Sequence, residues 1–427
     1  MFDPRQQCFD ALPYMISVRR RLHENPELAG REFMTVRFIR DELERMGIEY
    51  INIPDGGVLG IINGKAEGKT VLLRADCDAL PITESEVNGG GQPKVCVSTI
   101  KGAAHMCGHD SHTAMLLGAA SVLKDNTDQL AGRVFLLFER GEEGGKCIYY
   151  VLKYFEEHGI HVDACLGTHS DPTQPTGVIS VSGGPSSAGN VAFEIELTGK
   201  GGHGSRPDLS NNPIECFVAI ANSLKDIRMK EIPPTDPLTY NIGVVDGGTK
   251  RNIIPEKLFF TGTVRFYNAK MGLLFKNRVR EITETMAKLY RCTAEFKALY
   301  GPSLPVVNND EIGAMAADTV KRLFGEDAWR PTSAGMGSES FSFLCACYPS
   351  AMAKIGCRNE EKGMTAGGHD AHHEVDENCM PYGASLYCAF ASDYLAKAPE
   401  IPFAPFDGNA DDIMRFIDRP APPRYDK

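Results

Sequence analysis

The chain has 427 residues, more than one compact hydrophobic core usually organises, so two domains are the natural expectation. Hydrophobic residues make up 42% and charged residues 24%, and no apolar run approaches the roughly 18 residues of a membrane helix. The formal net charge of -11 and the lack of any basic run argue against a nucleic-acid partner.

The thirteen cysteines are scattered along the chain and never form a CxxC pair. This pattern is typical of a reducing compartment, where a special cysteine is more often a metal ligand than half of a disulfide. The N-terminus, MFDPRQQCFD, has no basic segment followed by an apolar one and so does not resemble a secretory signal. We therefore expect a cytoplasmic protein that does not interact with membranes.

Apolar runs and helical patterns alternate in the first part of the chain. Residues 13–48 have apolar positions three and four apart and predict one helical region that stops near Gly47. Three apolar runs that end in polar residues predict buried strands at 70–78, 133–143 and 163–170. Helical patterns cover 110–124 and 146–158. The sequence thus predicts an α/β domain with a mixed sheet, helices on both faces, and a ligand site beyond the carboxyl ends of the strands.

The pattern changes at about residue 187. Residues 191–198 alternate between apolar and more polar side chains, which predicts a strand with one buried face. Helix, strand, strand, helix and strand patterns follow at 213–227, 238–246, 257–267, 271–290 and 293–300. The order βαββαβ is that of a ferredoxin-like α+β module. We therefore predict a discontinuous catalytic domain, residues 1–186 and 301–427, interrupted by a smaller domain at 187–300.

The densest group of chemically reactive residues is the segment HMCGHDSHT at 105–113. Thiolate, imidazole and carboxylate groups are the ligands of Zn²⁺ and related first-row ions. A single histidine would have an ordinary structural explanation, but this segment sits where a strand leads into a helix. It combines five such side chains: His105, Cys107, His109, Asp110 and His112. The segment predicts a metal site.

The adjacent carboxylates Glu142 and Glu143 follow a predicted buried strand and precede two glycines. Adjacent acids on a surface helix are usually only solvated charges, but glycines let the backbone approach a site closely. Neighbouring side chains diverge, so one of the two could bind a metal while the other faces a substrate. A carboxylate beside activated water is the general base that amide hydrolysis needs.

Further candidate ligands are spread along the chain. Asp76 and Asp78 lie two residues apart in an extended segment, which puts both carboxylates on one side. They could bind metal, orient ligand imidazoles, or simply end a strand. His169 ends another apolar run, and three more histidines follow near the C-terminus: His369, His372 and His373. Spacing alone does not decide which of these three contacts a metal.

Taken together, these segments resemble the dimetal aminoacylase and amidohydrolase family, which includes hippurate hydrolases, N-acetyl-amino-acid deacetylases, auxin-conjugate hydrolases and aminobenzoyl-glutamate hydrolases. The resemblance runs from about residue 17 to 397, and the order and spacing of its motifs make it specific. The motifs are RRRLHENPEL, RADCDALP, HMCGHDSHT, EEGG, GKGGHGSRP, RNIIP, GTVRF, MGSESF and HDAHHEVDE.

The resemblance implies a site with two divalent cations, Zn²⁺ or Mn²⁺ in the first place and Co²⁺ or Ni²⁺ as alternatives, that share a hydroxide. Glu142 would act as the general base, and Asp78, with Asp76, would support the ligands. His369 is chosen over its neighbours because it alone gives an ungapped match to the last motif. The implied ligands are Cys107, His109, Glu143, His169 and His369.

The resemblance also assigns roles to the inserted domain. It would act as a lid and as the dimerisation surface of a homodimer. His203 would stabilise the oxyanion of the reaction, commonly by reaching across the dimer, and such donors are typically worth about 3 kcal/mol. Asn252 and Arg265 match positions that contact the substrate, although an ordinary surface charge is an equally good explanation for Arg265.

Several segments depart from the family pattern. ERG stands where relatives usually carry QPA, so Glu139 is expected to place an extra charge near the site. Asp208 replaces a common histidine, Asn212 replaces an aspartate, and Ser340 replaces an acidic residue. None of these changes removes an implied ligand or the base. A loop at 86–103 is longer than usual, and residues 400–427 extend beyond the resemblance.

The function implied is hydrolysis of the amide bond of an N-acyl amino acid or a similar small conjugate. One alternative is a metal-dependent dipeptidase or carboxypeptidase on the same scaffold, although the cluster around Cys107 favours the acyl-amino-acid branch. Another is a catalytically silent metal- or ligand-binding homologue, which would not need both Glu142 and Glu143. A structural zinc protein would need a closed site with closely spaced ligands, whereas these run from 107 to 369.

Overall fold

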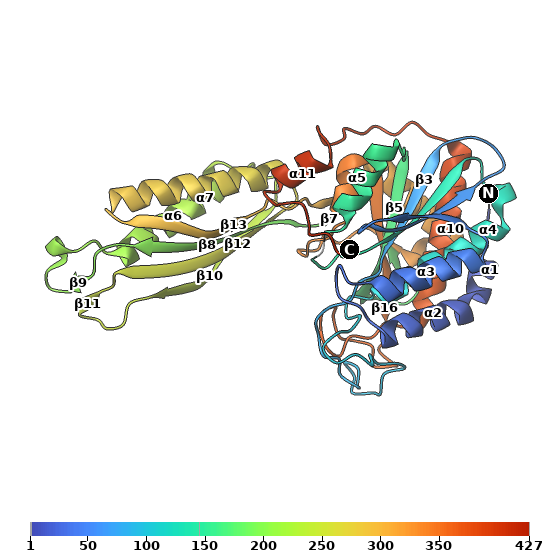
Figure 1. Cartoon of the computed structure of the whole chain (residues 1–427), viewed down its shortest axis with the longest axis horizontal. Helices are drawn as coiled ribbons and strands as arrows, with labels where there is room; N and C mark the ends of the chain where they lie inside the picture. The colour runs from blue at the N-terminus through green and yellow to red at the C-terminus, as the bar shows by residue number, and fades with distance from the viewer. Residues whose placement is uncertain (1, 145, 427) are drawn as a thin grey trace.

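The computed structural model describes residues 2–144 and 146–426. Two bodies lie end to end in Figure 1, one built on an eight-stranded sheet and the other on a four-stranded sheet. Among the described residues, no helix combines the length and the apolar character that crossing a bilayer requires.

The large sheet is mixed, with the strand order β1-β2-β4-β3-β5-β16-β6-β15. Its centre is parallel, because β3 pairs in parallel with β4 and β5, and β5 with β16. The strands are β1 (Glu49–Ile53), β2 (Gly57–Asn63), β3 (Thr70–Asp76), β4 (Arg133–Glu139), β5 (Ala164–Pro175), β6 (Ile179–Ser180), β15 (Trp329–Arg330) and β16 (Ser350–Arg358). The predicted mixed α/β sheet is therefore confirmed.

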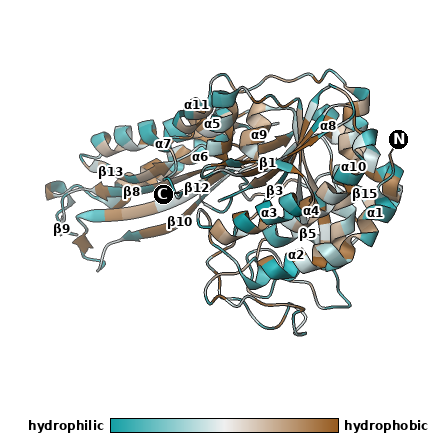
Figure 2. Ribbon diagram, turned by 45° about the vertical axis from the view of Figure 1, so that its right-hand side comes forward, coloured by the Kyte–Doolittle hydropathy of each residue, from teal (hydrophilic) through white to brown (hydrophobic). Residues whose placement is uncertain are grey.

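Helices cover both faces of this sheet, as predicted, and each face has its own apolar core. Val71 and Leu73 of β3 belong to one core, and Leu72 between them belongs to the other, as the alternation of a strand requires. The strands carry mostly hydrophobic residues in Figure 2. The first core packs against α1 (Arg5–Asp10), α2 (Leu12–Glu24), α3 (Phe33–Arg45), α4 (His109–Asp125), α8 (Asp310–Phe324) and α10 (Met380–Lys397). The second packs against α5 (Ile148–His158), α9 (Ser342–Cys347) and α11 (Ala410–Phe416).

The prediction of one helical region over 13–48 is wrong. The structure has two helices there, α2 and α3, separated by residues 25–32. Asn25 precedes Pro26, and a residue before proline is pushed away from the helical region by contact with the proline ring. The carbonyl of Glu27 instead accepts a hydrogen bond from the backbone of Ala79, at 2.8 Å, so the break ties the helices to the edge of the sheet.

The inserted body has the predicted ferredoxin-like topology. Its sheet has the order β10-β12-β8-β13, and every neighbouring pair is antiparallel. The elements are β8 (Gly189–Thr198), α6 (Pro213–Lys230), β10 (Leu238–Gly247), β12 (Lys257–Phe266), α7 (Ala269–Leu289) and β13 (Thr293–Tyr300). The apolar positions of β8 that alternation singled out are buried in a third, separate core: Val191, Phe193, Ile195 and Leu197.

Short elements join and extend the two bodies. β7 (Gly184–Ser187) pairs with β14 (Val306–Asn308) where the chain passes between them, close to the boundaries we place at 186/187 and 300/301. At the opposite end of the inserted body, β9 (Gly202–His203) pairs with β11 (Ile253–Ile254), as Figure 1 shows. Single 3-10 turns occur at Thr127–Gln129, Pro207–Leu209, Glu326–Ala328 and Glu377–Cys379.

Candidate metal centre

The candidate ligands lie at the carboxyl edge of the large sheet. Asp76 ends β3 opposite Glu139 at the end of β4, and His169 lies on β5. Glu142 and Glu143 follow β4 within four residues. Parallel strands end at one edge, so segments far apart in sequence deliver their polar side chains to one place.

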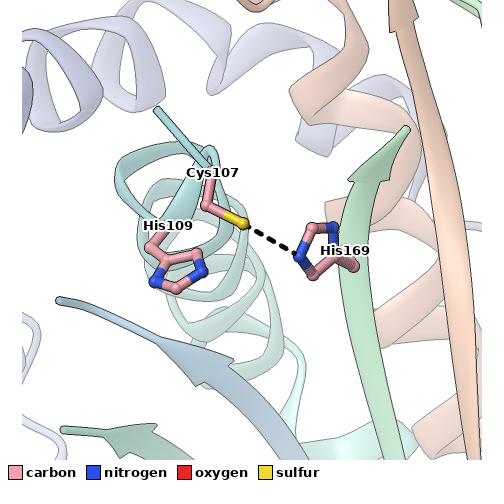
Figure 3. A group of neighbouring side chains, drawn as sticks. All are labelled: Cys107, His109 and His169. Carbon is pink, nitrogen blue, oxygen red and sulfur yellow. Dashed lines mark hydrogen bonds between the residues drawn. The ribbon is translucent and has the colours of Figure 1, made fainter. Parts of the chain in front are cut away.

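All five implied ligands, together with Glu142, come together there. Their ligand atoms form overlapping groups in which all atoms lie within 4.8 Å of one another. These groups are Cys107 with His109 and His169, Cys107 with Glu143 and His369, and His109 with Glu142 and Glu143. Figure 3 shows Cys107 at the start of α4 facing His169 on β5, with Sγ 3.5 Å from Nε2.

The chemistry of these atoms fits divalent cations. Among the described residues, His109 Nε2 is buried without a hydrogen-bond partner, which is costly unless another group completes it. Burial raises the pKa of the Cys107 thiol, so a nearby cation would be needed to hold it as a thiolate. Sulfur, nitrogen and carboxylate donors at one point are typical of Zn²⁺ and its neighbours.

Asp78 orients two of these ligands at once. Its Oδ1 lies 3.0 Å from Nδ1 of His109, which leaves Nε2 of that ring directed at the cluster. Its Oδ2 accepts a hydrogen bond from the backbone N–H of Glu143 at 2.8 Å. Asp76 instead contacts Nδ1 of His112 at 2.6 Å and lies 3.7 Å from Nε2 of His109. The three groups Asp76, His109 and His112 also satisfy the geometric criterion for a metal site.

The structure separates the three C-terminal histidines that spacing left open. His369 Nε2 lies 3.2 Å from Glu143 Oε1, and its backbone has a φ of +64°. A left-handed conformation is uncommon for a residue with a side chain. His372 is exposed and pairs with Asp370, whereas His373 is buried and contacts the carbonyl of Ala366.

Two other members of the 105–113 segment do not join the cluster. Asp110 pairs with Arg19 at 2.9 Å and with Nδ1 of His23 at 2.8 Å, which ties α4 to α2. His105 is buried and belongs to none of the groups that could hold a metal among the described residues.

Glu142 has the surroundings of a general base. Its Oε1 accepts a hydrogen bond from the backbone N–H of Ser340 at 2.9 Å. Burial, helped by the nearby carboxylates of Glu339 and Asp78, raises the pKa of Glu142 well above its ordinary value. A carboxylate that binds a proton readily beside a ligand cluster can take a proton from water and return it to a leaving group.

Glu139 lies beside the site, as expected, but its charge is buried and paired instead of open to a substrate. Glu139 is fully buried, with Oε2 2.7 Å from Nε of Arg74 and Oε1 accepting a hydrogen bond from Ser340 Oγ at 2.5 Å. The two departures from the family pattern, at 139 and 340, therefore contact each other directly, and Arg74 donates a hydrogen bond to both. A buried arginine was missed by sequence reasoning, although a lone cation inside the apolar run 70–76 was a signal for it.

The residues of the inserted body that were expected at the site divide into two groups. Arg265, at the end of β12, has Nη1 3.4 Å from Oγ of Ser338, which lines a cavity of 240 Å³ that Glu142 also lines. His203 on β9 and Asn252 just before β11 lie at the far tip and are not brought to the ligands of their own chain (Figure 1).

The two departures near that tip have local partners. Asp208 is exposed and pairs with Arg206 at 2.7 Å. Asn212 accepts a hydrogen bond from the N–H of Ile214 and so caps the start of α6. Sequence reasoning also missed two residues that line the 240 Å³ cavity, Lys146 and Arg419. Neither lies in a recognisable motif.

Comparison with known proteins agrees with this geometry. IAA-amino acid hydrolase ILR1-like 2 of Arabidopsis thaliana is 34% identical over 93% of this chain and 88% of its own. Thermostable carboxypeptidase 2 of Saccharolobus solfataricus is 35% identical over 90% of this chain and 96% of its own. N-acetyl-L-cysteine deacetylase of Bacillus subtilis is 34% identical over 86% of this chain and 84% of its own.

A solved structure is also similar. The Bacillus subtilis YXEP protein, described as a dinuclear metal binding peptidase, superposes with a TM-score of 0.73 at 28% identity, covering 91% of this chain and 99% of that one. Residues 72–393 match the model of peptidase family M20/M25/M40. That match spans every ligand candidate and the whole inserted body, and the chain belongs to the M20/M25/M40 peptidase family.

Proposed function

We propose that this protein is a metal-dependent amidohydrolase that cleaves the amide bond of N-acyl amino acids or similar small conjugates. The observation that carries the proposal is the convergence of Cys107, His109, Glu143, His169 and His369 on one point beside Glu142. The relatives named above act on conjugates and N-acetyl compounds of amino acids, as their names say, which supports the same reaction class.

The five ligands would hold two divalent cations, with Zn²⁺ or Mn²⁺ favoured and Co²⁺ or Ni²⁺ tolerated by the same donors. When bound, such ions supply Lewis acidity and lower the pKa of water to near neutrality. Asp78 keeps His109 and Glu143 in place through its two oxygens. Asp76 holds His112 and pairs with Arg74, which stiffens the strand end beneath the ligands.

Glu142 would move the proton. The Ser340 N–H fixes its Oε1, so Oε2 remains to accept a proton from water and to pass it to the departing amine nitrogen. Arg265 stands at the rim of the cavity beside Ser338, where its guanidinium would bind the carboxylate of an amino-acid product. Motion of the inserted body over the cavity would exclude water during the reaction.

His203 and Asn252 would complete the site from a second copy of the chain. Both lie at the tip of the inserted body, away from the ligands of their own subunit, and β10 is an edge strand of its sheet. Exposed apolar side chains occur on β10 and α6 at Val218, Val244 and Val245. A homodimer formed through this lid would bury them and bring the imidazole of His203 to the oxyanion.

The rival reading is a carboxypeptidase or dipeptidase, since a carboxypeptidase is as similar in sequence as the amidohydrolases are. A silent homologue is the other rival. Glu142 is present with its hydrogen-bonded support, which favours an active enzyme. All thirteen cysteines are free thiols, which supports the proposed cytoplasmic location.

The decisive experiment measures amine release from N-acyl amino acids and dipeptides by chelator-stripped protein, with and without added Mn²⁺ or Zn²⁺. We expect metal-restored hydrolysis of N-acyl amino acids. Hydrolysis of dipeptides alone would show that the enzyme is a peptidase instead. Cys107→Ser is the matched metal-site variant, and it should bind the added metal at least about tenfold more weakly than the wild type. Unchanged metal affinity would remove Cys107 from the ligand set.

A further inference from the structure

The cavity beside the candidate base carries positive charge that the proposed chemistry does not use. It has a volume of 240 Å³ and is lined on one side by Glu142, Glu143 and Glu339. Lys146 and Arg419 line it as well. The cavity therefore brings two cations of the chain next to the point where the amide bond would be cleaved.

The acids of this cavity already have partners. Glu143 lies against His369, Glu339 lies 3.1 Å from Arg74, and Glu142 receives the Ser340 N–H. Each negative charge is thereby directed to the ligand cluster or to the sheet edge behind it. These carboxylates are not the partners of the two cations.

Lys146 and Arg419 lack such partners. Among the residues that the structure describes, neither side chain forms an ion pair with a carboxylate. Burial, with a smaller contribution from the charge of Arg419, lowers the pKa of Lys146 to about 8. Lys146 is half-buried, whereas Arg419 is exposed. A half-buried cation without a counter-ion is costly, and two neighbouring cations on one cavity wall favour the binding of an anion.

Arg419 reaches the cavity on a segment that the family match does not include. The matched residues end at 393, and the chain then runs through α11 and back across the junction of the two bodies. Asp418 pairs with Lys276 of α7 at 2.5 Å, and the guanidinium of Arg419 lies 4.1 Å from the centre of the Tyr300 ring. These contacts hold the segment at the cavity.

The far end of this segment is fixed on the other body. Asp426 pairs with Arg140 at 2.7 Å, and the backbone N–H groups of Tyr425 and Asp426 donate to Asp55. Arg424 also lies 3.1 Å from the Asp55 carboxylate. The segment is thus anchored on both sides of Arg419, so the position of its side chain is part of the fold.

We propose that Lys146 and Arg419 form an anion-binding subsite, which selects amide substrates that carry a second carboxylate. The proposal rests on the proposed amidohydrolase function and specifies its substrate class. A simple N-acyl amino acid has one carboxylate, and Arg265 at the rim is sufficient to bind it. Two further cations on the cavity wall match a dicarboxylic substrate, with the extra acid either on the amino-acid side chain or on the acyl group.

The kinetic test uses pairs of substrates that differ only by carboxylate against amide: N-acetylglutamate with N-acetylglutamine, and N-succinylglycine with N-succinamoylglycine. We expect the wild type to prefer the acid of at least one pair. Arg419→Gln and Lys146→Gln should each raise KM for that acid by about tenfold and change KM for its amide by less than twofold. Equal kcat/KM for acid and amide in both pairs, or a preference that survives both substitutions, would overturn the subsite.

Arg415→Gln is the matched control, because Arg415 lies on α11 four residues earlier, is exposed, and pairs with Asp412 away from the cavity. It should behave as the wild type with every substrate. A binding experiment separates failure of the subsite from failure of the proposed function. Calorimetry with glutarate and butyrate needs no turnover, and glutarate should bind about tenfold more weakly to Arg419→Gln while butyrate binds equally. Equal glutarate affinity would reject the subsite even if the enzyme hydrolyses N-acyl amino acids.

Discussion

The two bodies of this protein differ in where they keep their charges. The large domain buries charged side chains at the carboxyl edge of its sheet, among them Arg74, Asp76 and Glu139. The inserted body has an apolar core, and the only buried charge among its described residues is Lys276. Its other ion pairs, such as Asp226 with Lys230, lie in solvent.

This difference indicates which domain positions the chemical groups of the proposed site. A buried charge costs folding free energy, so a fold retains it where it positions chemistry or where a partner neutralises it. The large domain buries its charges beside the candidate ligands and the proposed base Glu142. The inserted body has an apolar core, and the residues proposed for the site lie at its two ends: Arg265 at the base, and His203 with Asn252 at the tip. Even Lys276 pairs with Asp418 of the C-terminal segment.

The largest effect is expected from Glu142, the proposed general base. Glu142→Gln should keep metal content and lower kcat by about 10²- to 10⁴-fold, because general acid–base catalysis contributes that much. Metal analysis and steady-state kinetics on the same preparation measure both. Near wild-type turnover would show that the large domain does not carry the base at this position.

A somewhat smaller effect is expected from the tip of the inserted body. His203→Ala should lower kcat by about 10²- to 10³-fold, as loss of one oxyanion donor does. Mixing Glu142→Gln with His203→Ala subunits should restore activity, because one site of each mixed dimer then has both wild-type groups. Mixtures that remain as inactive as their components would place His203 outside the partner's site.

The buried charges at the sheet edge should make stability depend on pH. Burial raises the pKa of Glu139 to about 7, above the value of 4.5 for a free glutamate, despite Arg74. The folded chain then binds more protons than the unfolded chain between these values, so ionisation destabilises the fold as the pH rises. Relative to Glu139→Gln, the wild type should lose about 3 kcal/mol of unfolding free energy between pH 4.5 and 8. Denaturant titrations of both chelator-stripped proteins at pH 4.5 and pH 8 measure this loss. An equal change of unfolding free energy with pH in the wild type and in Glu139→Gln would contradict the prediction.

The smallest effect is expected from the solvated charges of the inserted body. Asp226 and Lys230 are more than half exposed, and an exposed pair of this kind contributes about 0.5 kcal/mol or less. Lys230→Ala should leave kcat unchanged and shift the denaturation midpoint only slightly. A loss of several kcal/mol would mean that the two bodies do not divide buried and exposed charge as described.

Much of the fold was predictable because periodicity is a local property. The alternation of residues 191–198 and the order of the elements after it identified the ferredoxin-like module, and the buried runs identified the central strands. The break between α2 and α3 was missed, because the apolar spacing on its two sides matches and only Asn25 and Pro26 signal the interruption.

The candidate ligands were predictable for a different reason, since thiol, imidazole and carboxylate groups are unusual in such density and at strand ends. Residues without a distinctive chemistry were not predictable in this way. Sequence reasoning assigned no role to Arg74, which β3 places between Asp76 and Glu139, or to Lys146, which lies at the start of a predicted helix.

By itself, the sequence determined which side chains are available for metal binding and proton transfer, and which segments form strands and helices, because both depend on residue type and near neighbours. Only the tertiary structure decided which of His369, His372 and His373 faces Glu143, that Glu139 pairs with Arg74 and Ser340, and that Arg419 lines the cavity with Lys146. These contacts join residues up to 273 positions apart in the chain. Their distances follow from how the sheet and the C-terminal segment pack, and no local sequence pattern encodes that packing.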